Sequence, residues 1–385
     1  MKRIYLDHAA TTPVAPEVFE AVRASMQEGW GNASSTHSDG QSARRAVDSA
    51  RISVASLIGA KPEEIYFTSG ATESANWVVG GAPDFLKGRG DRLLLSTVEH
   101  PCVLASARHA GARGWKTPHI GVAAGGIIRL DELKDALREK TALVSLMLAN
   151  NETGVIQPVR EASRLAGEAG ALFHTDATQA PGRIRIDVKE LGVDYLSLSA
   201  HKFYGPKGVG ILFARRGVPL EPFMRGGEQE HGRRAGTLNG PGITGMGEAA
   251  SLASRNLDKW ADHARAVRNG LENGILSGIR GAELNGAKEP RLPSHLNVFL
   301  PGVDAEALLM ALDVAGVSAS TGSACSSGTV EPSHVLAGMG FPRERALSSI
   351  RLSTGEANVP SDADAALEIL VTAVNRLLKT SPRAR

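Results

Sequence analysis

Lys202 lies in a stretch of sequence that could do amine chemistry. The run 194–210 reads DYLSLSAHKFYGPKGVG, in which 195–198 is typical of a buried strand and a turn rich in glycine and proline follows the lysine. A lysine just past the carboxyl end of a parallel strand faces the crevice in which such sheets bind ligands. If burial lowers its pKa, the amine can form a Schiff base with a carbonyl compound. A surface lysine in a polar turn fits this stretch equally well, so other residues must decide.

Polar residues follow four further predicted strands, which we place at 64–68, 92–96, 142–148 and 172–175. Strands that alternate with helices form a mostly parallel sheet with helices on both faces, and their carboxyl ends share one edge. Another strand, at 209–213, follows so closely that we expect it to be antiparallel to its neighbour. The polar strand ends therefore predict one site at this edge, although the residues are far apart in the sequence.

The turn after the first of these strands, Ser69-Gly70-Ala71-Thr72, suits a phosphate group. A glycine turn that opens a helix offers free backbone N–H groups and the positive end of the helix dipole, and Thr72 adds a hydroxyl. A plain helix N-cap is the alternative interpretation, because serine and threonine are common caps.

Asp176 has the chemistry to pair with the protonated pyridine nitrogen of pyridoxal phosphate (PLP), where a carboxylate strengthens the electron sink. An N-cap aspartate is the alternative. Gln179 and Asn151 could reach the cofactor's phenolic oxygen, and His100 could stack on the pyridine ring. His100 taken alone would more often be a structural histidine. The co-occurrence of these residue types is what points to PLP.

Arg351 and Cys325 add a carboxylate clamp and a thiol. Arg351 lies in SSIRLS, where serine and apolar neighbours predict a buried strand, and its planar fork can bind a carboxylate through two hydrogen bonds. Cys325 lies in STGSACSSGTVEP, whose small residues predict a loop and an accessible, reactive thiol. Cys102, in EHPCVLAS, has apolar neighbours, and we expect it merely to be buried at the start of a helix.

Composition argues against several classes of protein. The 385 residues are 42% hydrophobic and 22% charged, as in ordinary soluble enzymes, and the net charge of +2 gives no field that would attract nucleic acid or an anionic membrane. The N-terminus lacks an apolar signal segment, and no apolar run is long enough to span a membrane. Two cysteines far apart form neither a disulfide framework nor a metal cluster, so we expect a cytoplasmic protein without a bound metal.

The sequence pattern changes after the first part of the chain. A mostly continuous long helix is predicted at 248–275. Short strands at 296–300 and 350–352 and a helix at 305–314 follow, and they indicate a smaller α+β unit.

We therefore predict two domains. The large PLP-binding α/β domain would span 15–257. The small α+β domain would consist of 1–14 and 258–385, and it would carry Cys325 and Arg351. The N-terminal piece is too short to be a domain and must pack on a later part of the chain.

The motifs resemble those of cysteine desulfurases of the NifS/IscS type, which are fold-type-I PLP-dependent transferases of the class-V aminotransferase family. The matching pieces run in family order from residue 5 to residue 353: YLDHAATTPV, GNASSTHSDG, FTSGATES, EHPCVL, NNETGVIQP, HTDATQAPG, SLSAHKFYGPKGVG, RRAGTLN, STGSACSSG and SSIRLS. SAHKFYGPKG together with GSACSSG is highly specific, since the second motif separates the long-loop class from the short-loop class. One departure is Glu228, which replaces a glycine of the family's glycine-rich run.

The resemblance implies the catalytic roles. Lys202 would hold the cofactor covalently and take the proton from the substrate's Cα, and Cys325 would accept the sulfur. Arg351 and Asn151 would bind the substrate's carboxylate, and His100 would stack on the cofactor and take part in catalysis.

The resemblance also implies the other cofactor contacts. Asp176 would pair with the pyridinium, while Gln179 and Asn151 would contact the phenolic oxygen. Thr237 would reach the phosphate of the other subunit, which implies a homodimer with shared PLP sites. The phosphate ligands within the chain would be Ala71, Thr72, Ser199 and His201.

The implied reaction removes sulfur from L-cysteine, gives L-alanine, and leaves a persulfide on Cys325 for an acceptor protein such as an iron–sulfur scaffold. An aminotransferase or a selenocysteine lyase of the same fold is the alternative, but an aminotransferase needs no thiol, so Cys325 argues against it. A non-catalytic scaffold that only binds a partner is the alternative of another class, and the filled catalytic positions argue against it. The sulfur acceptor and the pathway stay open.

Overall fold

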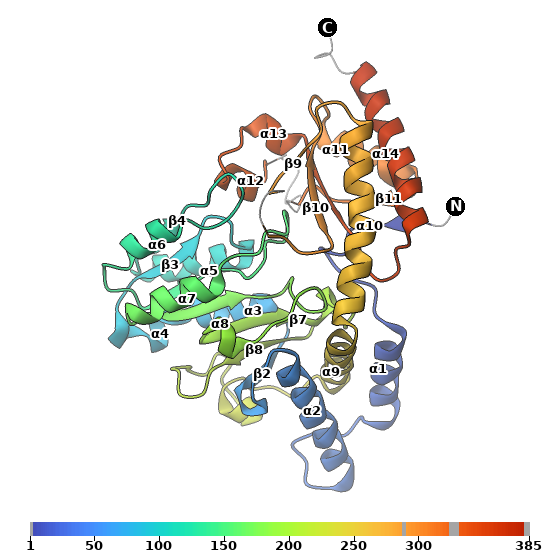
Figure 1. Cartoon of the computed structure of the whole chain (residues 1–385). Helices are drawn as coiled ribbons and strands as arrows, with labels where there is room; N and C mark the ends of the chain where they lie inside the picture. Colours follow the sequence, from blue (N-terminus) through green and yellow to red (C-terminus); the bar gives the residue numbers. More distant parts are fainter. Residues whose placement is uncertain (1–2, 287–289, 323–330, 381–385) are drawn as a thin grey trace.

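A seven-stranded sheet forms the centre of the larger part of the chain. The computed structural model describes residues 3–286, 290–322 and 331–380 (Figure 1). The strand order is β2-β8-β7-β6-β5-β3-β4. Strands β7, β6, β5, β3 and β4 are parallel, and β8 is antiparallel to both of its neighbours, β7 and β2. The strands are β2 (Ile65–Thr68), β3 (Leu93–Ser96), β4 (His119–Ile120), β5 (Leu143–Ser145), β6 (Leu172–Asp176), β7 (Tyr195–Ser199) and β8 (Gly210–Ala214).

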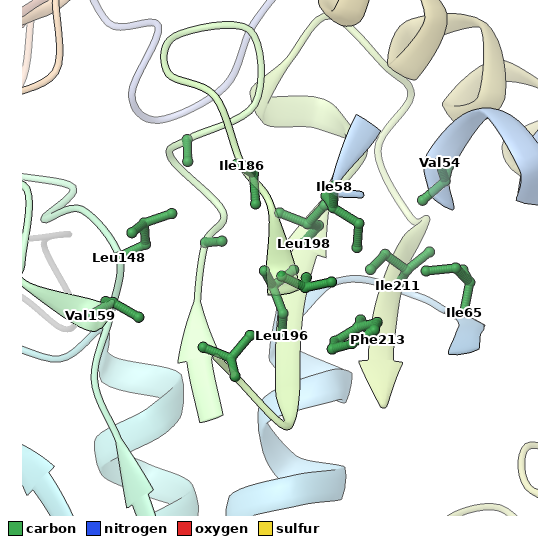
Figure 2. Close-up of a cluster of buried hydrophobic side chains, with 14 of the residues drawn as sticks. Val54, Ile58, Ile65, Leu148, Val159, Ile186, Leu196, Leu198, Ile211 and Phe213 are labelled. Carbon is green, nitrogen blue, oxygen red and sulfur yellow. The ribbon is translucent and has the colours of Figure 1, made fainter. Parts of the chain in front are cut away.

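Both faces of this sheet are buried. Side chains alternate along a strand, and the chain uses this period to supply two hydrophobic clusters. Leu94 and Leu196 belong to one cluster, while their strand neighbours Leu93, Leu95 and Tyr195 belong to another. Figure 2 shows part of the first cluster, where side chains of β7, β8 and β2 meet those of α2. The near-continuous apolar strands follow from this burial on two sides.

Helices cover the sheet and connect its strands. Helix α9 packs along α1 and α2, which lie together at one end of the molecule in Figure 1. The helices of this part are α1 (Pro16–Glu28), α2 (Ser38–Leu57), η1 (Pro62–Glu64), α3 (Ala71–Ala75), η2 (Asn76–Gly80), α4 (Ala82–Phe85), η3 (Lys87–Arg89), α5 (Pro101–Ala112), α6 (Leu130–Ala136), α7 (Val159–Glu168), α8 (Val188–Leu191), η4 (Ala200–Lys202), η5 (Gln229–Gly232) and α9 (Gly240–Arg255).

The predicted, mostly continuous helix at 248–275 is interrupted at one residue. Helix α9 ends at Arg255 and α10 begins at Leu257. Asn256 between them has φ −109° and ψ 9°, and its backbone N–H and its side-chain amide both donate to the carbonyl of Leu252. The backbone bond is the ordinary helical one, while the side-chain amide competes for the same carbonyl, and this competition favours an interruption at Asn256. Figure 1 shows that α10 then rises away from the sheet toward the smaller part of the chain.

The smaller part builds its own core around a second, antiparallel sheet of order β12-β10-β9. Leu6 from the N-terminal piece joins this core, and β1 pairs in parallel with β11. The elements are β1 (Ile4–Tyr5), α10 (Leu257–Gly278), β9 (Glu283–Leu284), β10 (His295–Phe299), α11 (Ala305–Val314), β11 (Val317–Ser318), α12 (His334–Gly338), α13 (Arg343–Leu347), β12 (Ser349–Ser353) and α14 (Pro360–Thr380).

The predicted fold class is confirmed: a mostly parallel α/β sheet with helices on both faces, accompanied by a smaller α+β part. The separate hydrophobic core of the smaller part supports our division at residues 14/15 and 257/258, which we keep as a proposal. Within the described ranges, no helix has the length and apolar character that a membrane span needs.

Candidate active site

A pocket opens at the carboxyl edge of the large sheet, where the ends of β3, β5, β6 and β7 meet the start of α3. This is the crevice in which open α/β sheets bind ligands. Nine of the residues predicted to form the site line it. The lining consists of Ala71, Thr72, His100, Cys102, Met147, Ala149, Asn151, Asp176, Thr178, Gln179, Ser199, His201 and Lys202.

Lys202 lies in the short turn η4, three residues past the end of β7. Its Nζ donates to the carbonyls of Ala9 and Ala10, both at 2.7 Å, in the N-terminal segment. Burial first, and then the charges of Arg351 and Arg183, lower the pKa of Lys202 to about 8, while Asp176 opposes the shift. A neutral amine is therefore within reach near neutral pH. The surface-lysine interpretation is excluded.

Asp176 and Gln179 form the side of the pocket at the end of β6. Asp176 is 6% exposed, and its Oδ1 accepts a hydrogen bond of 2.9 Å from the backbone N–H of Thr178. Gln179 donates from Nε2 to the carbonyl of Ala9 at 3.0 Å. Its Oε1 is buried and has no hydrogen-bond partner in the described part of the chain. A buried acceptor without a donor is unusual and points to a ligand or water.

His100 caps the N-terminus of α5 and carries a defined tautomer. Its Nδ1 accepts from the backbone N–H of Cys102 at 3.2 Å, so the proton of the neutral ring sits on Nε2. Burial lowers the pKa of His100, which favours this neutral form. The ring is thus positioned as a proton donor through Nε2.

Cys102 lies closer to the pocket than the sequence suggested. It packs against a hydrophobic cluster as expected, but it also lines the pocket, with Sγ 3.0 Å from Nδ1 of His100. The prediction that it is merely buried is therefore incomplete. The sequence did hold a signal, since Cys102 follows His100 by two residues at a helix start. Burial raises the pKa of the Cys102 thiol to about 12, which keeps it neutral and unreactive.

The turn predicted to bind phosphate is held close to β7. The backbone N–H of Ala71 donates to the hydroxyl of Ser199 at 2.7 Å. A side chain at Gly210 would place its Cβ 2.6 Å from the Cα of Gly70, so only glycine permits this approach. Burial lowers the pKa of His201 to about 4, so this neighbour of Lys202 is neutral.

Arg351 reaches the site from the other sheet. It lies on β12, is 4% exposed, and donates from Nη2 to Oδ1 of Asp7 at 2.7 Å and from Nη1 to the carbonyl of Asn151 at 3.0 Å. Its Nε is buried and has no partner among the described residues. Arg351 does not itself line the pocket, but it touches Asn151, which does.

Two predicted site residues are not brought into this pocket. Thr237 is exposed and lies outside the lining. Cys325 falls outside the residues that the structure describes. Their expected roles stay predictions.

Two buried titratable residues behind the pocket were not assigned a role from the sequence. Glu99 accepts from the hydroxyl of Ser96 and the backbone of Met147, and burial raises its pKa to about 8. His174 lies between the hydroxyls of Ser145 and Ser197, at 2.8 and 2.9 Å, and burial lowers its pKa to about 4. Apart from Ser96, these partners come from distant parts of the sequence, so no sequence pattern reveals the contacts.

Comparison with known proteins defines the protein family. Residues 4–365 match the family model "Aminotransferase class-V", so the chain belongs to this family. Two curated relatives are both named "Cysteine desulfurase IscS". The protein of Dictyoglomus turgidum is 44% identical over 99% of this chain and 97% of its own length, and that of Methanosarcina thermophila is 43% identical over 99% and 94%. A solved structure titled "NifS-like protein" superposes with a TM-score of 0.91 at 36% identity, covering 97% of this chain and all of that one.

The comparisons therefore confirm the family predicted from the motifs. Class-V aminotransferases and cysteine desulfurases depend on PLP, so the family carries the cofactor as well as the fold.

Proposed function

We propose that this protein is a PLP-dependent cysteine desulfurase that converts L-cysteine to L-alanine and leaves the sulfur as a persulfide on Cys325. The observation that carries the proposal is the shared pocket of Lys202, Asp176, Gln179 and His100. An amine of lowered pKa, a carboxylate, an acceptor without a donor and a neutral histidine converge there from the ends of three strands, β3, β6 and β7. The full-length similarity to cysteine desulfurases supports the same conclusion.

The pocket's groups fit PLP. Lys202 Nζ is an amine for the aldehyde carbon, and the buried Asp176 carboxylate suits the pyridinium. The unpartnered Oε1 of Gln179 would accept from a bound hydroxyl group, and the hydroxyls of Ser199 and Thr72 suit the phosphate. When bound, PLP withdraws electrons from the substrate's carbon atoms.

Lys202 would then act as the base. Its pKa of about 8 leaves enough free amine to take the proton from the substrate's Cα onto Nζ. The carbonyls of Ala9 and Ala10, each 2.7 Å from Nζ, would stabilise the resulting ammonium. His100, with its proton on Nε2, is placed to return a proton to the carbon skeleton.

Substrate orientation would come from Arg351. Its guanidinium has one donor without a partner, and the substrate carboxylate would provide the missing acceptor, with Asn151 beside it. The thiolate of Cys325 would form a bond to the substrate's sulfur while the carbon–sulfur bond breaks. The electron pair stays with the carbon skeleton, which takes up a proton and leaves as alanine.

We further propose a cytoplasmic homodimer in which the exposed Thr237 reaches the phosphate of the other subunit. The persulfide would pass to an acceptor protein such as an iron–sulfur scaffold, in keeping with relatives that carry the name IscS.

The test is a single turnover of the PLP-loaded protein with L-cysteine. Alanine should appear in an amount equal to the active sites, and mass spectrometry should find one added sulfur on the peptide with Cys325. The peptide with Cys102 is the internal control and should stay unmodified. A keto acid product would instead identify an aminotransferase, and a protein that binds no PLP would favour the scaffold alternative.

A further inference from the structure

Glu152 is a buried carboxyl group in the turn between β5 and α7, next to Asn151. It is 2% exposed. Its backbone N–H donates to Oδ1 of Asn150 at 2.9 Å, and its carbonyl accepts from Nδ2 of Asn297 at 3.2 Å on β10. Both backbone groups are thus fixed, and the direction of the side chain follows from them. Burying a carboxyl group costs free energy unless the group has a hydrogen-bond or charged partner.

The side chain of Glu152 contacts the chain on both sides of residues 323–330. On one side, the hydroxyl of Ser333 donates to Oε2 of Glu152. On the other side, Gly322 lies so close that a Cβ there would sit 2.9 Å from Oε2 and 3.0 Å from Cδ and Cγ. Gly322 also has φ +92°, which disfavours other residues. One carboxyl group therefore joins two points that are eleven positions apart in the sequence.

Each of these points is tied to the active site. Ser333 caps α12 by accepting from the N–H of Leu336, and His334 contacts the carbonyl of Glu99 through Nε2 at 2.9 Å. Ser320, two residues before Gly322, exchanges backbone hydrogen bonds with Arg351. Glu152 itself follows Asn151, which lines the pocket. The contacts of Glu152 thus connect the pocket wall with Gly322, which precedes Cys325 in the sequence, and with Ser333, which follows it.

We propose that Glu152 is a positioning residue for sulfur transfer: it fixes the two chain ends, Gly322 and Ser333, between which the sequence carries Cys325. This inference rests on the proposed function, since it assigns Glu152 to the step in which Cys325 takes the sulfur. No described hydrogen bond joins Glu152 to Lys202 or Asp176, so we expect cofactor and substrate binding to change little when Glu152 is replaced.

The test compares Glu152→Ala with Glu152→Gln in the PLP-loaded protein. Alanine at this position leaves Ser333 without its acceptor, whereas glutamine keeps the size and an oxygen that can accept from the hydroxyl. Ser333→Ala removes the same bond from its other partner. Because Ser333 also caps a helix, Asp304→Ala is the matched control: Asp304 caps α11 through Ala307 and has no contact with Glu152.

We expect a split between binding and sulfur transfer. The midpoint of the cofactor's spectral response to L-cysteine should stay within about twofold of wild type in all four variants. Single-turnover alanine formation should fall about tenfold in Glu152→Ala and Ser333→Ala, the factor that a lost buried hydrogen bond represents, and remain within about twofold in the other two. Equal alanine rates in Glu152→Ala and wild type, or equal losses in Glu152→Ala and Glu152→Gln, would overturn the proposal.

A second measurement needs no turnover. The rate at which N-ethylmaleimide labels Cys325, followed by mass spectrometry, should change about tenfold in Glu152→Ala and Ser333→Ala, while the labelling of Cys102 should not change. If wild type produces no alanine, the proposed function fails, but this labelling still tests the role of Glu152. Unchanged labelling of Cys325 in both variants would refute the positioning role.

Discussion

The carboxyl edge of the large sheet and strand β12 both serve the candidate site, but they do so in different ways. At the sheet edge, Asp176 and Lys202 stand at or just past the ends of neighbouring strands, and parallel pairing alone brings them together. Arg351 lies within a strand of a second sheet, and its guanidinium is aimed by Asp7 and by the carbonyl of Asn151. The strand topology determines where the groups at the edge lie, whereas hydrogen bonds of its own side chain determine where the guanidinium of Arg351 lies.

This difference separates two tasks. The edge holds the groups that fit the cofactor, and it is rigid because each strand end is locked in a hydrogen-bonded ladder. The residue that we assign to the substrate comes from the other core, so its distance from the cofactor depends on how the two parts of the chain pack. We therefore expect changes at the sheet edge to affect the cofactor, and changes around Arg351 to affect the substrate.

Replacing Lys202 at the edge should have the largest effect. Lys202→Ala should abolish turnover and the covalent attachment of PLP, since Lys202 is the one lysine among the described residues that line the pocket. The measurement is alanine formation together with borohydride reduction of the loaded protein and mass spectrometry. A variant that still keeps a reducible, protein-linked cofactor would contradict the assignment of Lys202.

Removing Arg351 should weaken substrate binding while the cofactor stays. Losing a charge-assisted, paired contact to a carboxylate costs on the order of 2 to 4 kcal/mol, so kcat/KM for L-cysteine should fall about 30-fold or more in Arg351→Ala. The fall should appear mainly in KM, and the absorbance of the bound cofactor should be retained. An unchanged KM for cysteine would mean that β12 does not serve the substrate.

The pH dependence of stability should report the buried amine of Lys202. Its pKa is 10.5 in the unfolded chain and about 8 in the fold, so the unfolded state binds more protons between these pH values. Stability should therefore rise with pH across this window, and the penalty is fully present below pH 8. Relative to Lys202→Met, cofactor-free wild type should gain about 2 to 3 kcal/mol between pH 7.5 and 10.

Chemical denaturation of both proteins at each pH measures this difference, and the other titrating groups cancel. Parallel stability curves for wild type and Lys202→Met would show that Lys202 keeps an ordinary pKa in the fold.

Asp7 tests the side-chain contacts that aim Arg351. Asp7→Ala leaves a guanidinium at 4% exposure without its carboxylate, and we expect a loss of about 2 kcal/mol in the free energy of unfolding. In the Arg351→Ala background the same change should cost clearly less, because its partner is already gone. Additive losses would show that the pair does not hold Arg351.

Cys102 should show the smallest effect. Cys102→Ser keeps a donor beside His100, so alanine formation should stay within about twofold, and stability should fall by less than about 1 kcal/mol. Cys325→Ser, by contrast, should keep the bound cofactor and its response to cysteine but form almost no alanine. Full alanine formation by Cys325→Ser, or added sulfur on Cys102, would reverse the roles of the two thiols.

Sequence patterns located the sheet edge closely. The predicted strand at 172–175 became β6 (Leu172–Asp176) and the one at 195–198 became β7 (Tyr195–Ser199), because apolar runs of strand length between turns report burial directly. The pattern failed at β5, predicted at 142–148 and found at Leu143–Ser145, since 146–149 stays buried after its ladder ends. It also gave no sign of the one-residue interruption at Asn256, whose side-chain amide donates to the carbonyl of Leu252.

The sequence by itself determined the family, the parallel sheet and the set of residues that gather at its edge. The strands and their polar ends depend on residues that are neighbours in the sequence, so the sequence pattern predicts them. Only the tertiary structure decided which side chains from distant segments meet: Arg351 with Asp7, and Glu152 with Gly322 and Ser333. Such contacts depend on the packing of distant segments, and no spacing along the chain encodes their distances.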